Sequence, residues 1–303
     1  MNDKQRERNI MREICVVTDS HSGISQEEAS RLGIFVVPMP FYFGDECYYE
    51  GVSITRDEFF KRLAAGEEVS TSQPSPMDVT SVWDKALEIA KYVVYIPISS
   101  GLSGSCETAM MLANDDKYQG KVFVVDNGRV SALLHRSVLD ALELVEKGYS
   151  PEKIKKILEE SRADMNIYVA VDTLEHLKRG GRISATSAVL GTLLNIKPVL
   201  KFDVGTLDVH AKARGFIKAK KIMLEALKND LETKFKECYE KQEVYLLAAG
   251  STIKEVAEKW VAEIKEFFPG MDVIYDDLTM GLCCHIGQGG LGIGCSCKPR
   301  LTD

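Results

Sequence analysis

The chain has 303 residues, of which 45% are hydrophobic and 27% charged, and a formal net charge of −7; this is typical of a soluble globular protein, and the length predicts two domains. The acidic balance argues against broad, nonspecific nucleic-acid binding and against docking on anionic membranes by charge alone. There is no run of about 18 apolar residues and no apolar secretory signal at the charged N-terminus, so we expect a cytoplasmic protein without a transmembrane helix.

The first half of the chain alternates apolar runs with helix-forming stretches. The apolar runs predict buried strands over residues 14–18, 34–38, 92–98 and 121–125. Helices are predicted from residue 25 and over residues 55–63, 76–91, 103–113, 130–147 and 151–161. Residues 41–53 look like an aromatic loop and residues 68–76 like a polar loop. Apolar strands separated by helices are typical of a parallel sheet covered on both faces, so residues 1–163 are predicted to form an α/β domain.

The pattern changes after about residue 163. Shorter strands are predicted over residues 167–171, 196–200, 207–210, 244–249 and 273–275. Helices are predicted over residues 174–179, 184–193, 214–230 and 252–267. We therefore expect residues 164–303 to form an α+β domain. No linker rich in Pro, Gly or Ser separates the two domains, so we expect them to pack firmly, with a ligand cleft between them.

Two loops rich in hydroxyl groups lie next to predicted helix N-termini. One runs from Thr71 to Pro74 and the other from Ser99 to Ser105. Ligands of parallel sheets bind beyond the C-terminal ends of the strands, where hydroxyls and free backbone N–H groups suit a carboxylate or a phosphate. The alternative interpretation is that these residues only cap their helices.

Ser103 lies where a hydrolase would carry its nucleophile. The surrounding residues 101–105 read Gly-Leu-Ser-Gly-Ser, so the second glycine of the G-x-S-x-G motif is displaced. The sequence also identifies no His–Asp pair to accompany the serine. One hypothesis is nevertheless that the protein is an enzyme in its own right, either a small-molecule phosphotransferase or a hydrolase that uses Ser103.

A basic segment surrounds the diglycine turn at Gly180 and Gly181. Arg179 precedes this turn and Arg182 follows it. A helix that runs into two glycines commonly ends there, and basic residues at that end complement the helix dipole. The alternative is that the two arginines bind a phosphate or the acidic surface of a partner.

A glycine-rich tract near the C-terminus carries a histidine and four cysteines, namely Cys283, Cys284, His285, Cys295 and Cys297. The spacing is CC and CxC and not the paired CxxC of a zinc site, so we expect no metal. The glycines indicate close approach of the backbone or positive φ angles. His285 is either a structural histidine or a donor that faces a ligand. A further hypothesis, a metal- or redox-responsive protein, depends on these cysteines.

In this order and spacing, the segments resemble the DegV family of bacterial fatty-acid-binding proteins almost from end to end. The matching segments are Thr-Asp-Ser (18–20), Thr-Ser-Gln-Pro-Ser (71–75), Ser-Ser-Gly-Leu-Ser-Gly-Ser (99–105), Leu-Lys-Arg-Gly-Gly-Arg-Ile (177–183), Ile-Lys-Pro (196–198) and His-Ile-Gly (285–287). The resemblance implies a two-domain α/β protein that holds one long-chain fatty acid, such as palmitate, stearate or oleate, between its domains, without a cofactor. It also implies a non-catalytic role, as the acyl-carrier subunit of a fatty acid kinase whose separate catalytic subunit phosphorylates the bound carboxylate.

The same resemblance implies roles for single residues. Thr71 and Ser103 correspond to carboxylate contacts, with His285 nearby. Arg179, Arg182 and Arg214 correspond to basic positions that look like kinase or phosphate contacts. This chain departs from the family in two places: Gln288 stands where the family commonly has proline, and residues 126–132 lack the glycines expected after the serine. Both departures concern acyl preference more than the fold.

The chemistry of such a ligand is consistent with this reading. Burying about fifteen methylenes at roughly 0.8 kcal/mol each gives about 12 kcal/mol, which association costs of about 4–15 kcal/mol largely offset. The tail therefore supplies the affinity, and the head group sets the orientation. The chain has no G-x-x-x-x-G-K-[ST] motif for ATP, so a kinase partner would have to bind the nucleotide.

Overall fold

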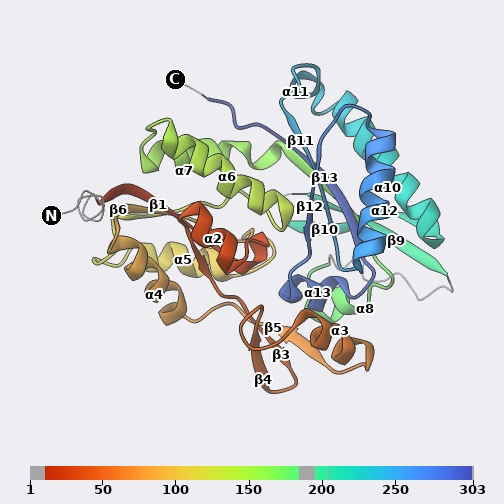
Figure 1. Cartoon of the computed structure of the whole chain (residues 1–303), viewed down its shortest axis with the longest axis horizontal. Helices are drawn as coiled ribbons and strands as arrows, with labels where there is room; N and C mark the ends of the chain where they lie inside the picture. The colour runs from red at the N-terminus through yellow and green to blue at the C-terminus, as the bar shows by residue number, and fades with distance from the viewer. Residues whose placement is uncertain (1–10, 184–194, 204, 302–303) are drawn as a thin grey trace, which may run out of the picture.

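The computed structural model describes residues 11–183, 195–203 and 205–301. The helix predicted over residues 184–193 lies outside this part of the chain. The strands form three sheets, and helices pack against the two larger ones (Figure 1). Among the described residues, no helix is both long enough and apolar enough to cross a bilayer.

The first half of the chain is built on a four-stranded parallel sheet with the order β2-β1-β6-β7. Its strands are β1 (Arg12–Asp19), β2 (Phe35–Val37), β6 (Ala90–Ile96) and β7 (Val122–Val124). Its helices are α2 (Gln26–Leu32), α4 (Pro76–Leu87), α5 (Ser105–Ala113), α6 (Ala132–Glu146) and α7 (Pro151–Glu160). Helices α4 and α5 pack on one face of the sheet, and α2, α6 and α7 pack on the other. The predicted parallel sheet with two covered faces is confirmed.

The second half contains a six-stranded mixed sheet with the order β10-β9-β8-β13-β11-β12. Its strands are β8 (Met165–Ala170), β9 (Ile196–Asp203), β10 (Thr206–Arg214), β11 (Val244–Gly250), β12 (Val273–Asp277) and β13 (Leu291–Cys297). Its helices are α8 (Glu175–Gly180), α10 (Gly215–Glu232), α11 (Lys236–Glu240), α12 (Lys254–Phe267) and α13 (Met280–Ile286). Helices α10 and α12 cover one face, and the other face packs against the core that contains α6. This is the α+β arrangement that the sequence predicts.

A small antiparallel sheet, β4-β3-β5, shows that the prediction of loops over residues 41–53 and 68–76 was wrong. Its strands are β3 (Pro40–Phe43), β4 (Glu46–Tyr49) and β5 (Val69–Thr71), and α3 (Arg56–Ala64) packs on it. Phe41 and Phe43 are buried against Phe59, with Phe41 in edge-to-face contact with the Phe59 ring. Burial of these alternate aromatic residues stabilises strands that are too short to be recognised from propensity alone.

The glycine-rich tract forms the second unexpected strand, because β13 lies between β8 and β11 in the middle of the larger sheet. Glycine is a poor strand former, so no strand was predicted here. At Gly294 a Cβ atom would lie 2.7 Å from the carbonyl oxygen of Asn166 on β8. This glycine is therefore required by the close approach of the neighbouring strand.

The cores of the two halves are continuous. One cluster joins β1, α6 and α7 to β8 and β9, and another joins the small sheet to α13. The loop after β6 also meets the turn between β9 and β10, where a Cβ on Gly101 would lie 2.2 Å from the Cα of Gly205. The chain passes from η3 (Ser161–Ala163) into β8 at the proposed domain boundary, residues 163 and 164.

A histidine links the two halves and makes the stability dependent on pH. His135 on α6 hydrogen-bonds Asp276 on β12 through Nδ1 at 3.0 Å, and its Nε2 lies 3.6 Å from Glu28 on α2. Burial opposes the charge on this imidazole, but the hydrogen bond to Asp276 and the two carboxylate charges outweigh it and raise the pKa of His135. The folded state therefore favours the protonated histidine.

We expect this interaction to stabilise the protein fully below the ordinary histidine pKa near 6.5, and to be lost as the pH rises through the raised pKa. Urea unfolding of the wild type and of His135→Gln across this range tests the expectation. The difference in free energy of unfolding between them should shrink as the pH rises. His210→Gln is the control, because burial lowers the pKa of His210 and its loss should not remove the effect.

Candidate functional site

An apolar cavity lies between the two halves of the molecule. The space empty of protein atoms measures about 1020 Å³, part of it open to solvent. The roof comes from the first half of the chain, through the loop after β6 and the start of α6. The floor comes from the six-stranded sheet, and α13 forms one side. The apolar lining includes Ile98, Leu102, Val130, Leu133, Ile167, Val169, Leu177, Phe202, Leu207, Leu247, Leu278, Leu282 and Ile286.

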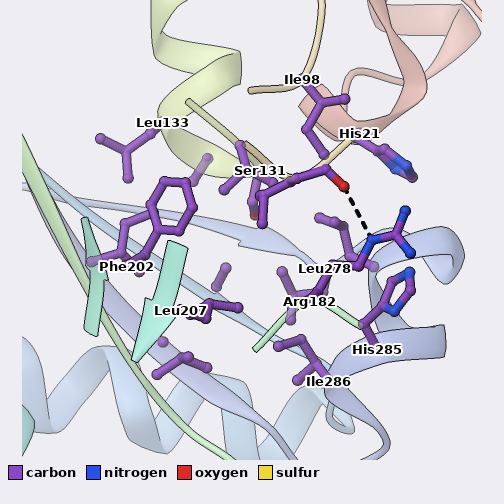
Figure 2. Close-up of a pocket in the computed structure, with 18 of the residues that line it drawn as sticks. His21, Ile98, Ser131, Leu133, Arg182, Phe202, Leu207, Leu278, His285 and Ile286 are labelled. Carbon is purple, nitrogen blue, oxygen red and sulfur yellow. Dashed lines mark hydrogen bonds between the residues drawn. The ribbon is translucent and has the colours of Figure 1, made fainter. Parts of the chain in front are cut away.

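Several polar side chains of the lining lie together at one end of this cavity. Figure 2 shows His21, Arg182 and His285 together at one end, and Leu133 and Phe202 at the other. Thr71 and Ser103 also line the cavity. The structure thus brings together all three residues that the resemblance assigns to a carboxylate. Their role as carboxylate contacts remains a proposal.

The sheet and the helix packing fix the pair formed by Thr71 and His285. Thr71 is the last residue of β5, where it pairs with Phe41, and its Oγ1 lies 2.9 Å from Nε2 of His285. The ring of His285 rests directly on α8, since a Cβ on Gly180 would lie only 2.0 Å from Nδ1. Gly180 therefore gives the imidazole the room it needs to reach Thr71.

Helix α13, which carries His285, is held at its other end by the first half of the chain. Glu50 accepts a hydrogen bond from the backbone N–H of Met280 at 3.0 Å. The N-cap residue Thr279 contacts Nδ1 of His21 through its hydroxyl at 3.3 Å. Gly281 then faces His21 so closely that a Cβ there would lie 2.4 Å from the ring. These contacts fix the position of α13 beneath the polar end of the cavity.

Some residues of the two hydroxyl loops and their flanks cap a helix or stabilise the loop, and others line the cavity. Ser75 caps α4 through a capping box with Asp78, as the alternative interpretation predicts. Ser100 donates a hydrogen bond to Asp126 at 2.6 Å and stabilises its own loop. Ser103 accepts a hydrogen bond from the backbone N–H of Ser105 at 3.2 Å, and its hydroxyl hydrogen is free to point into the cavity.

The electrostatics of the polar end follow from burial. Burial lowers the pKa of His21 to about 3 and the pKa of His285 to about 4, and the positive charge of Arg182 acts in the same direction. Both imidazoles are therefore neutral at physiological pH. Within the described part of the chain, Arg182 is the only charged residue that lines the cavity. The polar end thus presents hydroxyls, neutral imidazoles and one cation, which suits a single negative charge.

The three arginines singled out in the sequence do not lie together. Arg182 enters the cavity, where its Nε donates to the carbonyl oxygen of Leu102 at 3.1 Å and its Nη1 donates to the carbonyl oxygen of Gly180. Arg179 at the end of α8 and Arg214 at the end of β10 are exposed, and neither forms an ion pair within the described residues. Arg182 therefore belongs to the cavity, whereas Arg179 and Arg214 belong to the surface.

Arg179 and Arg214 are part of a basic region that the net charge of the chain conceals. Residues 178–221 contain ten lysines and arginines but only two acidic residues, so this segment carries an excess of eight positive charges in a chain of net charge −7. It comprises the end of α8, strands β9 and β10 and the start of α10. Lys197, Lys220 and Lys221 of this segment form ion pairs with carboxylates outside it, namely Asp172, Glu263 and Glu225.

Two polar residues of the lining were missed by the sequence analysis, namely His21 and Ser131, whereas Ser72 lies in the hydroxyl loop that the sequence singled out. His21 follows β1 in the 3-10 helix η2 (Ser20–Ser22), at the same sheet edge as the loop after β6. Ser131 has a φ of 55°, which is unusual for a residue other than glycine, and its N–H donates to the carbonyl oxygen of His21 at 3.1 Å. Polar residues directly after neighbouring strands were the available signal for His21.

The hypothesis of a Ser103 hydrolase gains no support from the geometry. Within the described residues, His285 bonds Thr71 and no imidazole hydrogen-bonds Ser103. The Nδ1 atom of His285 is buried and has no hydrogen-bond partner among the residues that the structure describes, so no carboxylate among them orients this ring. The cysteines are all free thiols, and no group of three His, Cys, Asp or Glu side chains in the described part of the chain is placed to hold a metal ion.

The fold and the cavity define an α/β protein with an elongated apolar cavity between its halves and one polar end. The model of the DegV family, described as a family of uncharacterised proteins, matches residues 13–298. The chain belongs to the DegV family.

Relatives and solved structures agree with this assignment. A DegV domain-containing protein from Deinococcus radiodurans is 38% identical over 207 residues, which cover 68% of this chain and 73% of the relative. The solved structure of a fatty-acid-binding DegV family protein from Thermus thermophilus is 33% identical, with a TM-score of 0.83, and the match covers 94% of this chain and 99% of that one. DegV from Bacillus subtilis, a fatty acid binding protein, is 29% identical with a TM-score of 0.81, covering 95% of this chain and 100% of that one.

Proposed function

We propose that this protein binds one long-chain fatty acid noncovalently, with its carboxylate at Thr71, Ser103 and His285 and its acyl chain along the apolar walls. The observation that carries the proposal is that His21, Arg182 and His285 lie together at one end of an apolar cavity, where His285 contacts Thr71. A fatty acid has the same division into a charged head and an apolar tail. The fatty-acid-binding relatives from Thermus thermophilus and Bacillus subtilis share this fold.

The head-group contacts follow from the hydrogen-bond donors that remain. When Nε2 of His285 carries its proton, it donates to the hydroxyl of Thr71, which then directs its own hydrogen to the ligand. Ser103 is a second donor, since its oxygen already accepts the N–H of Ser105 and its own hydrogen remains for the ligand. Arg182 supplies a positive charge next to these donors. Charge-assisted hydrogen bonds of this kind are stronger than those between neutral groups.

We further propose that the bound carboxylate is presented to a separate kinase subunit in the cytoplasm. Ser72 and Gly101, beside the polar end, are exposed, which suits access by a partner protein. In the proposed reaction a carboxylate oxygen attacks the γ-phosphorus of ATP held by the partner, ADP leaves, and an acyl phosphate results. Arg179 and Arg214 would contact the kinase or the phosphate group, and this protein itself would carry out no chemical step.

Native and denaturing mass spectrometry of protein purified without added lipid test the binding proposal. We expect a noncovalent adduct with the mass of a long-chain fatty acid, such as palmitate, stearate or oleate, that is lost on denaturation. A covalent acyl or phosphoryl group on Ser103 that survives denaturation would instead identify a stand-alone enzyme. A protein that carries no lipid and takes up none from added fatty acid would contradict the proposal.

A further inference from the structure

The floor of the cavity is made by two rows of residues that cross the six-stranded sheet. The first row consists of Val169 on β8, Gly292 on β13 and Ala249 on β11, which are direct neighbours in register. All three line the cavity. Strand β13 begins beside α13, since a Cβ on Gly290 would lie 2.4 Å from the side chain of Ile286. This first row is therefore the one nearer to the polar end.

The second row lies two residues farther from the polar end on each of these strands. It runs through Leu207, Phe202, Ile167, Gly294 and Leu247, and every member lines the cavity. The two glycines remove side chains from the middle of both rows. They leave a shallow channel along β13, bordered by the side chains of β8 and β11, that leads away from the polar end.

The channel ends at the second row. The next row consists of Met165, Ser296 and Tyr245, and none of them lines the cavity. Above Gly294, the channel is filled by Leu133 of α6, whose Cδ1 lies 3.3 Å from the position that a Cβ on Gly294 would take. Leu133 is 3% exposed and borders the cavity at the end remote from Arg182 (Figure 2).

Behind Leu133 the interior becomes polar. Ser137, one turn farther along α6, donates to the carbonyl oxygen of Leu133 at 3.0 Å and accepts from Asn127 at 2.7 Å and from Arg129 at 3.1 Å. All three of these polar residues are fully buried. A hydrocarbon terminus that passed Leu133 would have to displace a hydrogen-bonded network, which is costly in a protein interior.

We propose that Leu133 is the stop that sets the maximum length of the acyl chain. The proposal rests on the proposed binding of a fatty acid and adds which residue meets the methyl end. The side chain of Leu133 blocks the channel over Gly294, and a smaller residue at this position would leave the channel open. The buried network around Ser137 prevents the acyl chain from extending any farther. The length preference of the protein is therefore determined by the volume of this side chain.

Two substitutions of opposite size test the proposal. Leu133→Ala opens the channel over Gly294, so chains about two carbons longer are accommodated. Each additional buried methylene is worth roughly fourfold in affinity, so the relative affinity of these longer chains rises about fifteenfold. Leu133→Phe extends the stop and shifts the preference to shorter chains. The matched control is Leu134→Ala, the same change at the next residue of α6, which is fully buried and does not line the cavity.

The measurement is the chain-length distribution of lipid extracted from each purified variant, together with competition between saturated fatty acids that differ by two carbons. Opposite shifts in Leu133→Ala and Leu133→Phe, with Leu134→Ala like the wild type, support the proposal. The same distribution in all four proteins overturns it, as does an equal shift in Leu134→Ala. A wild type that binds no fatty acid contradicts the proposed function itself, which keeps the two failures distinct.

Discussion

Replacement of both Thr71 and Ser103 by alanine is expected to weaken fatty-acid binding by about two to four orders of magnitude. Each substitution removes a hydrogen bond to a charged carboxylate, worth about 1.5–3 kcal/mol, so the pair is worth about 3–6 kcal/mol. The acyl chain keeps its apolar contacts, so binding is weakened and not abolished. Titration of the delipidated protein with a fatty acid measures the change.

The fold is expected to survive this double substitution. Within the described residues, the Thr71 side chain bonds only His285, and Ser103 accepts one backbone N–H. Ser75→Ala is the control from the same loop, because its hydroxyl caps α4 and does not line the cavity. That control should lower the free energy of unfolding by about 1 kcal/mol and leave the affinity unchanged. Unchanged affinity in the double variant would show that the head group binds elsewhere.

The second large effect is expected on phosphorylation of the lipid. Arg179→Ala and Arg214→Ala should each leave fatty-acid affinity nearly unchanged, because neither residue lines the cavity. Each should lower acyl-phosphate formation about ten- to a hundredfold in an assay reconstituted with a fatty acid kinase catalytic subunit. A lost charge-assisted contact to the partner or to the phosphate accounts for a change of that size.

Arg31→Ala provides the control for charge, because Arg31 is an exposed arginine on α2 in the other half of the molecule. It should change neither quantity. Arg182 is unsuitable as a test of kinase contact, since it lines the cavity and bonds the backbone of Leu102. If lipid affinity and turnover fall together in the Arg179 and Arg214 variants, the two residues support the binding site. If neither falls, a simple lipid store becomes the better hypothesis.

The elements that were predicted correctly are those in which consecutive residues are apolar because both faces of the element are buried. Strands β1 and β6 contain unbroken apolar runs, residues 14–17 and 92–96, because helices cover both faces of their sheet. The strands that were missed depend on partners distant in the chain. Phe41 is buried by Phe59, and β13 is held by pairing on both sides even though glycines lower its strand propensity. Contacts of this kind are not visible in a local pattern.

The candidate site shows the same limit. The resemblance identified Thr71, Ser103 and His285, and the structure places all three at one end of the cavity. It did not separate Arg182 from Arg179, which is three residues away. Arg179 and Arg182 are separated by the end of α8, because Gly181, directly after the helix, has a φ of 66° and turns the chain inward. Arg182 therefore lines the cavity, and Arg179 is exposed to solvent.

The uneven distribution of charge has a consequence for experiments at different ionic strengths. Surface charges are screened over about 10 Å at 0.1 M salt and over about 3 Å at 1 M, whereas burial of an acyl chain does not depend on such screening. Association of the basic segment 178–221 with an acidic partner should therefore slow as salt is added, while the lipid stays bound. The proposed lipid binding and the proposed association with a partner can thus be separated in the same sample by salt alone.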